Sequence, residues 1–196
     1  MQTSDLIFSF VGHPKNAISD VTEGYCGGRI NHMGVIVQTP KGIFVLEAYP
    51  PEVRLTNIRM FLTQSKFRDS GPRYMLGRIQ QSDHHLITGA IEYGLAQRDV
   101  PYDHLYLTDE DALYCSELVI DMFRASNNGV SYFPESPMNF RDTETGQLHE
   151  TWISYYRRFG MEVPEKEPGS NPGEISLDER LDIYEVYGPI PGYISP

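Results

Sequence analysis

The chain has no long hydrophobic run and comparatively few basic residues. No stretch of 18 or more apolar residues occurs among its 196 residues, so we expect no integral membrane segment. The opening residues, MQTSDLIFSF, lack a basic segment followed by an apolar one, so no signal peptide is visible. The 16 Lys and Arg residues are outnumbered by 27 Asp and Glu residues, giving a net charge of -11. Because phosphate binding requires a basic surface, we expect no nucleic-acid partner.

Cysteine is scarce, and the familiar cofactor motifs are missing. Cys26 and Cys115 are too few for a disulfide scaffold and could form one bond or none. The cysteines therefore do not indicate whether the protein works in an oxidising or a reducing compartment. Neither a Walker-type phosphate loop nor a GxGxxG pattern occurs. The densest set of metal-ligand types is 83–85, Asp-His-His, but adjacent helix positions point in different directions. We therefore expect no metal and no cofactor.

The order of elements, strands first and helices later, predicts an α+β fold. A chain of this length fits a single domain over residues 1–196, and the Pro/Gly/Glu-rich segment that follows residue 161 suggests that 162–196 form a C-terminal surface extension. Apolar and β-rich runs predict strands at 5–10, 30–38, 42–49 and 73–79.

Two helices are expected in the second half of the chain. One is predicted from an N-cap at Ser82 to about Gln97. The next begins near Cys115, with an apolar stripe formed by Leu118, Val119, Met122 and Phe123.

The residues Thr39-Pro40-Lys41-Gly42 suit a type I turn, so the second and third strands are expected to form a hairpin. If Thr39 pairs with Gly42, then Gly34 faces Glu47, and His32 lies diagonally from Glu47 on the same face. A base and a carboxylate would then be neighbours, with glycine leaving room between them. A three-residue loop with a bulge at Gly42 would instead place Glu47 on the opposite face.

Cys115, at the expected helix start, is the leading candidate for chemistry. The free N–H groups of a helix N-terminus favour a thiolate and can stabilise an oxyanion. The alternative is a buried cysteine that packs as a small apolar residue. Cys26 is a weaker candidate nucleophile, because its glycine-rich loop offers no evident helix start.

A thiol nucleophile also needs a base. Of the six histidines, only His32 lies within a strand flanked by small and apolar residues, where its imidazole needs either a partner or a cleft. Glu47 interrupts the apolar run IFVLEAY, and a lone carboxylate there also wants a partner. A histidine bonded to backbone and a solvated strand-end carboxylate remain the alternatives. The full set of histidines is His13, His32, His84, His85, His104 and His149.

The segments NHMGVIV and FVLEAY, followed downstream by PYDHLY and YCSELV, resemble the circularly permuted NlpC-type papain-fold hydrolases, the YiiX/YaeF-like group. In ordinary papain-like enzymes the cysteine precedes the histidine, whereas His32 precedes Cys115 here, as in the permuted group. The resemblance covers most of residues 4–125. Ser4 stands where a glycine is usual in the opening strand.

The resemblance implies a permuted papain-like fold, in which an antiparallel sheet packs against helices and the catalytic cysteine lies at a helix N-terminus. It implies that Cys115 is the nucleophile, His32 the general base and acid, and Glu47 the residue that orients the imidazole. Tyr102 is similar to a tyrosine that this group places near the active site, with a substrate-binding or oxyanion role. An aromatic residue packed beside a turn is the other interpretation of Tyr102.

The resemblance implies a cysteine hydrolase of the amidase or peptidase type, acting through an acyl-enzyme on a small peptide such as a peptidoglycan fragment. A lipid amidase, esterase or acyltransferase of the same fold is the alternative, and a catalytically silent binding module is a third. The same resemblance favours the bacterial cell envelope or periplasm. Aromatic residues of the last third could wall either kind of substrate site or form core: Tyr132, Phe133, Phe140, Trp152, Tyr155 and Tyr156.

Overall fold

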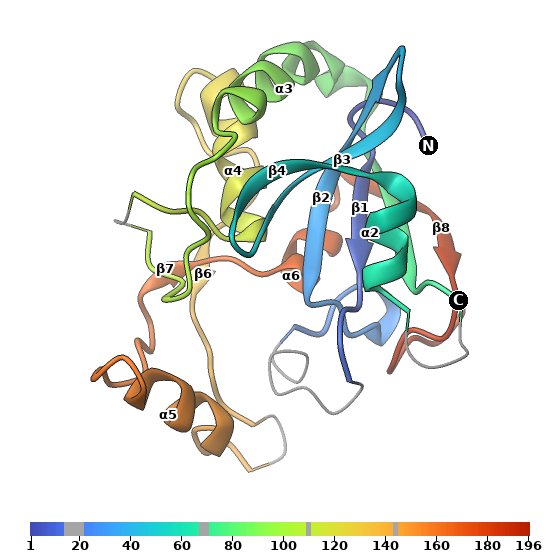
Figure 1. Cartoon of the computed structure of the whole chain (residues 1–196). Helices are drawn as coiled ribbons and strands as arrows, with labels where there is room; N and C mark the ends of the chain where they lie inside the picture. The colour runs from blue at the N-terminus through green and yellow to red at the C-terminus, as the bar shows by residue number, and fades with distance from the viewer. Residues whose placement is uncertain (14–21, 67–70, 109–110, 143–144) are drawn as a thin grey trace.

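The computed structural model describes residues 1–13, 22–66, 71–108, 111–142 and 145–196. Its centre is a six-stranded sheet of order β4-β3-β2-β1-β5-β8, in which all neighbouring strands are antiparallel (Figure 1). The strands are β1 (Leu6–Ser9), β2 (His32–Thr39), β3 (Gly42–Tyr49), β4 (Glu52–Asn57), β5 (Tyr74–Ile79) and β8 (Leu181–Tyr187). The predicted α+β fold with an antiparallel sheet packed against helices is confirmed.

The β2–β3 hairpin has the predicted register. Thr39 pairs with Gly42 and Val35 pairs with Leu46, so no bulge intervenes and Glu47 shares a face with His32. A Cβ at Gly34 would come within 2.5 Å of a Val45 methyl carbon and 3.3 Å of the Glu47 Cβ. Glycine is therefore required where the two polar side chains approach each other.

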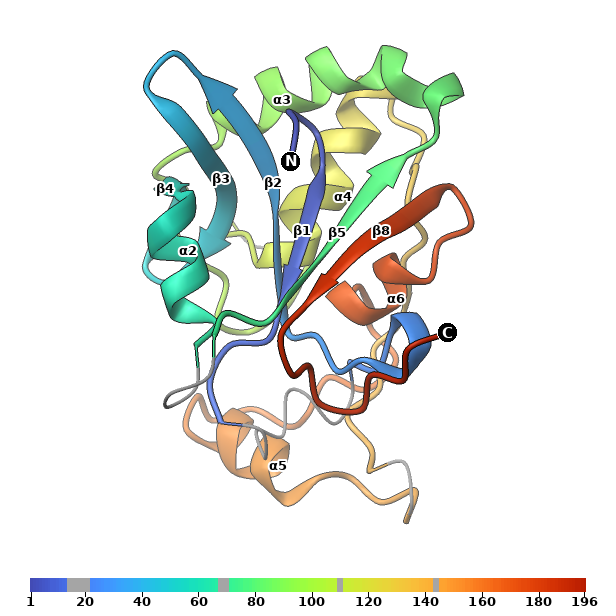
Figure 2. The ribbon, with the colours of Figure 1, turned by 90° about the vertical axis from the view of Figure 1, so that its right-hand side faces the viewer.

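Helices cover both faces of the sheet. α4 (Cys115–Ser126) and α2 (Ile58–Gln64) lie on opposite sides of β1 and β2 (Figure 1), and α3 (Ile87–Ala96) packs with α4 (Figure 2). The predicted apolar stripe of α4 is fully buried against alternate residues of β1 and β2. This stripe fixes the helix that begins at Cys115, because apolar burial is the dominant favourable term in folding.

The predicted helix start at Ser82 is wrong. Residues Gln81–Leu86 form a 3-10 helix, η2, and the α-helix begins only at Ile87. Tertiary contacts hold this tighter turn: the Tyr132 hydroxyl donates to the Asp83 carboxylate at 2.6 Å, and Leu86 is buried in the core.

Three elements of the sheet layer were not expected from the sequence: β4, α2 and β8. β8 pairs along the outer edge of β5, and Leu181 and Ile183 join the main core. The segment 162–196 is therefore more than a surface extension, because it supplies a strand that covers what would otherwise be an open sheet edge. It also carries the short helix α6 (Pro172–Ser176), whose Ile175 is fully buried.

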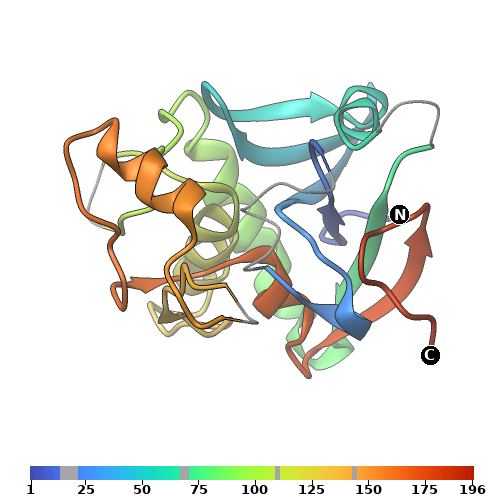
Figure 3. The same ribbon diagram turned by 90° about the horizontal axis from the view of Figure 1, so that it is seen from below.

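Two short strands, β6 (Ser136–Pro137) and β7 (Pro168–Gly169), pair with each other, and the segment between them extends away from the sheet. It carries α5 (Glu150–Arg157), which lies away from the sheet in all three ribbon views (Figures 1 to 3). Phe140, Trp152 and Tyr156 form a separate small core there. In the described part of the chain, no helix is both long and apolar enough to cross a membrane.

Candidate active site

Cys115 is the first residue of α4, as predicted. Tyr114 precedes it with an extended backbone, and the Glu117 carboxylate accepts a hydrogen bond of 3.3 Å from the Tyr114 N–H. The Cys115 side chain is 5% exposed and lines a cavity. Its sulfur therefore lies where the unpaired N–H groups of a helix start converge and a small molecule can enter.

His32, the first residue of β2, lies between a thiol and a carboxylate. Its Nε2 is 2.6 Å from Oε2 of Glu47, and it also hydrogen-bonds to Cys115. Because Nε2 is taken by Glu47, the remaining Nδ1 is the nitrogen that faces the thiol. Burial alone would lower the pKa of His32, but the hydrogen bonds and charges of Cys115 and Glu47 raise it to about 9.

Glu47 is fully buried and is held by more than the histidine. Thr56 donates to Glu47 Oε1 at 2.5 Å, and Arg54 Nε lies 3.4 Å from the same oxygen. Burial would raise the pKa of Glu47, but His32, Thr56 and Arg54 together bring it below its usual value. The residue is therefore an anion at neutral pH, satisfied on both oxygens.

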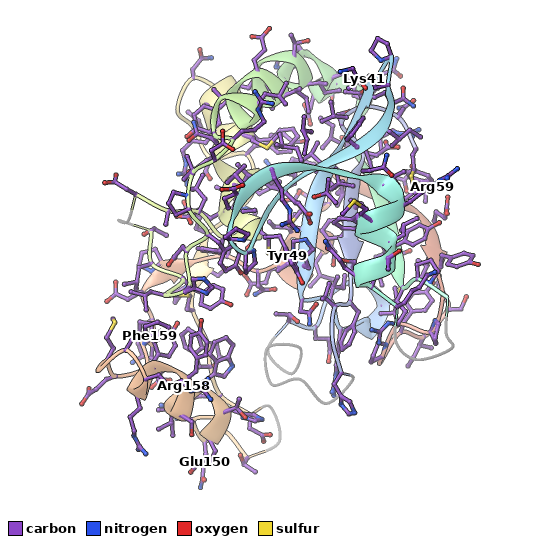
Figure 4. The ribbon with its side chains drawn as sticks, viewed as in Figure 1. Lys41, Tyr49, Arg59, Glu150, Arg158 and Phe159 are labelled. Carbon is purple, nitrogen blue, oxygen red and sulfur yellow. The ribbon has the colours of Figure 1, made fainter. Side chains whose placement is uncertain are left out.

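Aromatic rings fix the plane of the imidazole. The Tyr49 ring meets His32 edge-on at a centroid distance of 5.1 Å, and Phe61 of α2 packs against it at 5.5 Å. Figure 4 labels Tyr49 at the end of β3, near the β3–β4 turn. The Arg54 guanidinium lies over the Tyr49 ring at 5.0 Å, so β4 supports both the carboxylate and this ring.

The cavity beside Cys115 has a volume of about 340 Å³, within the usual range of small-molecule sites. The aromatic and apolar residues that line it include Tyr49, Pro50, Tyr102, Tyr106, Met138, Phe140 and Trp152. The polar residues that line it include Thr22, Asn31, Ser116, Ser136, Ser170, Asn171 and Glu174. Among the described residues that line it, none is Lys or Arg.

Tyr102 lies in the wall of this cavity together with Cys115. Its backbone bridges to Leu113, just ahead of α4, and its hydroxyl hydrogen-bonds to that of Tyr106. Burial raises the pKa of Tyr102 well above its usual value, so the phenol stays protonated as a donor. The placement agrees with the sequence prediction, and the role remains a proposal.

Of the other candidates, His104 lines the cavity, whereas His13, His84, His85 and His149 do not. Cys26 lies outside the cavity lining and is a free, half-buried thiol, as Cys115 is a free, buried one. Of the six late aromatic residues, Phe140 and Trp152 line the cavity, and Tyr132, Phe133 and Tyr156 are buried in the core clusters.

Sequence reasoning missed Arg54 and Thr56, which hold Glu47, and the polar cavity wall around Ser170 and Glu174. The alternation of apolar and polar residues in EVRLTN could have identified β4, and with it the face shared by Arg54 and Glu47. No local signal brings residues 170–174 to α4, because that contact depends on the folded chain.

The chain belongs to the family of permuted papain-like amidase enzymes, YaeF/YiiX, C92 family, whose model matches residues 1–181. Among solved structures it resembles the crystal structure of metalloprotein YiiX from Escherichia coli O157:H7, with a TM-score of 0.75 and 20% identity, over 96% of this chain and 98% of that one. At this identity the likeness shows the fold. No curated protein matches the chain. YiiX is described as a metalloprotein, but the described residues of this chain include no group of three or more His, Cys, Asp or Glu side chains placed to hold a metal ion.

Proposed function

We propose that this protein is a cysteine amidase in which Cys115 attacks the carbonyl carbon, His32 moves the proton and Glu47 orients the imidazole. The observation that carries this proposal is the chain of contacts from the Cys115 thiol through His32 to Glu47 at the edge of a cavity. A nucleophile, a base and an orienting group within hydrogen-bond reach are the requirements for covalent acyl transfer.

The first half-reaction forms a thioester. Because the pKa of His32 is raised to about 9, the imidazole already holds the proton of the Cys115 thiol. The Cys115 sulfur bonds to the amide carbon, and the carbonyl oxygen becomes an oxyanion. The C–N bond then breaks, and His32 returns the proton to the departing amine. In the second half-reaction a water attacks the thioester and gives a proton to His32, which passes it back to the leaving thiolate. The products are the free acid and the amine.

We assign stabilisation of the oxyanion to two groups. The backbone N–H of Cys115 lies in the first turn of α4, where N–H groups have no helical partner. Tyr102 shares the cavity with Cys115 and keeps its proton. Donors aimed at developing charge in a partly dry cavity are worth more than the same donors in water.

The cavity wall favours an amide with an apolar acyl group. Aromatic rings and Met138 contribute to its lining, and no described lining residue is a Lys or Arg that could pair with a substrate carboxylate. A cell-wall peptide rich in carboxylates fits this lining less well. The function that the site supports best is therefore hydrolysis of an N-acyl amide with an apolar acyl chain.

The test compares an N-dodecanoyl alkylamide with a muramyl peptide amide as substrates for the wild type, Cys115→Ala and the control Cys26→Ala. We expect the wild type and Cys26→Ala to release amine from the acyl amide, and mass spectrometry of a quenched reaction to find the acyl group on Cys115. Turnover of the muramyl peptide alone would establish the cell-wall alternative. Absence of turnover on both, with binding retained in Cys115→Ala, would establish a silent binding module.

A further inference from the structure

Glu174 places a carboxylate in the wall of the cavity that holds Cys115. It lies in the first turn of α6 and is half-buried. Burial raises the pKa of this carboxyl group, and hydrogen bonds from the side chains of Ser136 and Asn171 partly offset that effect. None of the described Lys or Arg side chains pairs with it. A partly desolvated carboxylate without a cation is costly and is relieved by a positively charged ligand.

The position of Glu174 relative to Cys115 is fixed by contacts of Ser170, which lies between β7 and α6, with the start of α4. The Ser116 hydroxyl donates to the Ser170 carbonyl at 3.1 Å, and the Ser170 N–H donates to the Tyr114 hydroxyl at 3.1 Å. The two bonds are made by the residues directly before and directly after Cys115. The Asn171 side chain then caps α6 by accepting from the Glu174 N–H at 2.9 Å. These contacts therefore hold the Glu174 carboxylate in the lining of the cavity.

We infer that Glu174 binds a protonated amine of the substrate, so that the amide cleaved at Cys115 belongs to an acylated diamine. The apolar lining residues receive the acyl group, and Glu174 with its polar neighbours receives the amine-derived half, whose second amine is charged at neutral pH. The same carboxylate repels substrates with an anionic leaving half. The inference rests on the proposed function in one respect, since it takes this cavity as the place where the scissile amide lies.

The first test measures charge selection at Cys115 without any turnover. Cys115 is modified with cationic 2-aminoethyl methanethiosulfonate and with anionic 2-sulfonatoethyl methanethiosulfonate, and peptide mass spectrometry separates it from Cys26. We expect the cation-to-anion ratio of rates to fall about tenfold in Glu174→Gln, as expected for one charge at cavity distances. The ratio in Glu179→Gln, which removes an exposed carboxylate on the same segment, should equal that of the wild type. An equal ratio in Glu174→Gln and the wild type would overturn the inference.

The second test uses three matched amides: N-dodecanoyl-1,4-diaminobutane, N-dodecanoyl-butylamine and N-dodecanoyl-4-aminobutanoate. We expect kcat/KM to decrease in that order, and Glu174→Gln to reduce the preference for the first over the third by about tenfold or more. Cys115-dependent cleavage of all three at equal rates would refute the amine site and leave the amidase proposal standing. Charge selection in the labelling test without cleavage of any amide would refute the amidase and leave the amine site standing.

Discussion

Nε2 of His32 lies 2.6 Å from Oε2 of Glu47, and the two side chains are 5% and 0% exposed. They come from neighbouring strands, at the open end of the β2–β3 hairpin, and share one face of the sheet. Because Glu47 accepts from Nε2, the imidazole presents Nδ1 to the thiol, so the carboxylate selects the tautomer as well as the ring orientation.

Glu47→Gln should reduce kcat by about 10²- to 10⁴-fold with little change in KM, because an amide can hold the ring but cannot stabilise the imidazolium. Thr56→Val, which removes only one hydrogen bond to Glu47, should cost less. The measurement is steady-state hydrolysis of an N-acyl amide together with circular dichroism to verify folding. Equal losses in the two variants would show that Glu47 acts through packing alone.

The raised pKa of His32 predicts a pH-dependent stability. The group titrates near 6.5 when unfolded and at about 9 when folded, so its stabilising contribution is fully present below pH 6.5 and is lost as the pH rises through 9. Over that window we expect the advantage of the wild type over His32→Gln in unfolding free energy to shrink by about 3 kcal/mol. Urea unfolding of both proteins from pH 6 to pH 10 measures this difference. A difference that stays constant with pH would contradict the raised pKa.

The His32–Glu47 pair could be predicted from the sequence because hairpin register follows from a short turn and period-two alternation. Cys115 at a helix start could be predicted for a similar reason, since the apolar stripe of α4 is local in sequence. The supports of Glu47 were missed because β4 was not predicted, although the alternation in EVRLTN indicates a strand that carries Arg54 and Thr56.

The other missing parts depend on contacts between distant segments. β8 pairs with β5 across more than half the chain, and Ser170 meets Tyr114 and Ser116 only after folding. No periodicity within the segment 162–196 specifies these partners. The sequence therefore indicates the reacting groups more readily than the walls that determine which substrate reaches them.

Tyr102→Phe should lower kcat for the N-acyl amide about 10²-fold and leave KM nearly unchanged, if its hydroxyl donates to the oxyanion only in the transition state. The phenyl ring keeps the aromatic wall, so the loss reports on the hydroxyl. Tyr187→Phe, at an exposed position of β8, is the matched control and should retain the wild-type rate. A parallel rise in KM with kcat unchanged would instead assign Tyr102 to ground-state binding.

Glu117→Gln should stabilise the protein above mildly acidic pH. Glu117 lies in the first turn of α4 and is 8% exposed. Burial raises its pKa to about 8, although the hydrogen bond from the Tyr114 N–H opposes the shift, and the charges of Asp121, Asp103 and Glu135 raise the pKa further. The stability that the neutral form of Glu117 contributes is fully present below its unfolded pKa of 4.5 and is lost as the pH rises through 8. A glutamine stays neutral and can still accept from the Tyr114 N–H.

The unfolding free energy of Glu117→Gln should therefore exceed that of the wild type by an amount that grows between pH 5 and pH 8, reaching more than about 1 kcal/mol. Urea unfolding at several pH values in this range measures the difference, and Glu179→Gln, an exposed carboxylate, should show no such trend. If the two variants behave alike, Glu117 is ionised in the folded protein at neutral pH. A growing advantage for Glu117→Gln would mean that the helix carrying Cys115 holds a neutral carboxyl group in its first turn, which leaves its N–H dipoles uncompensated at the nucleophile.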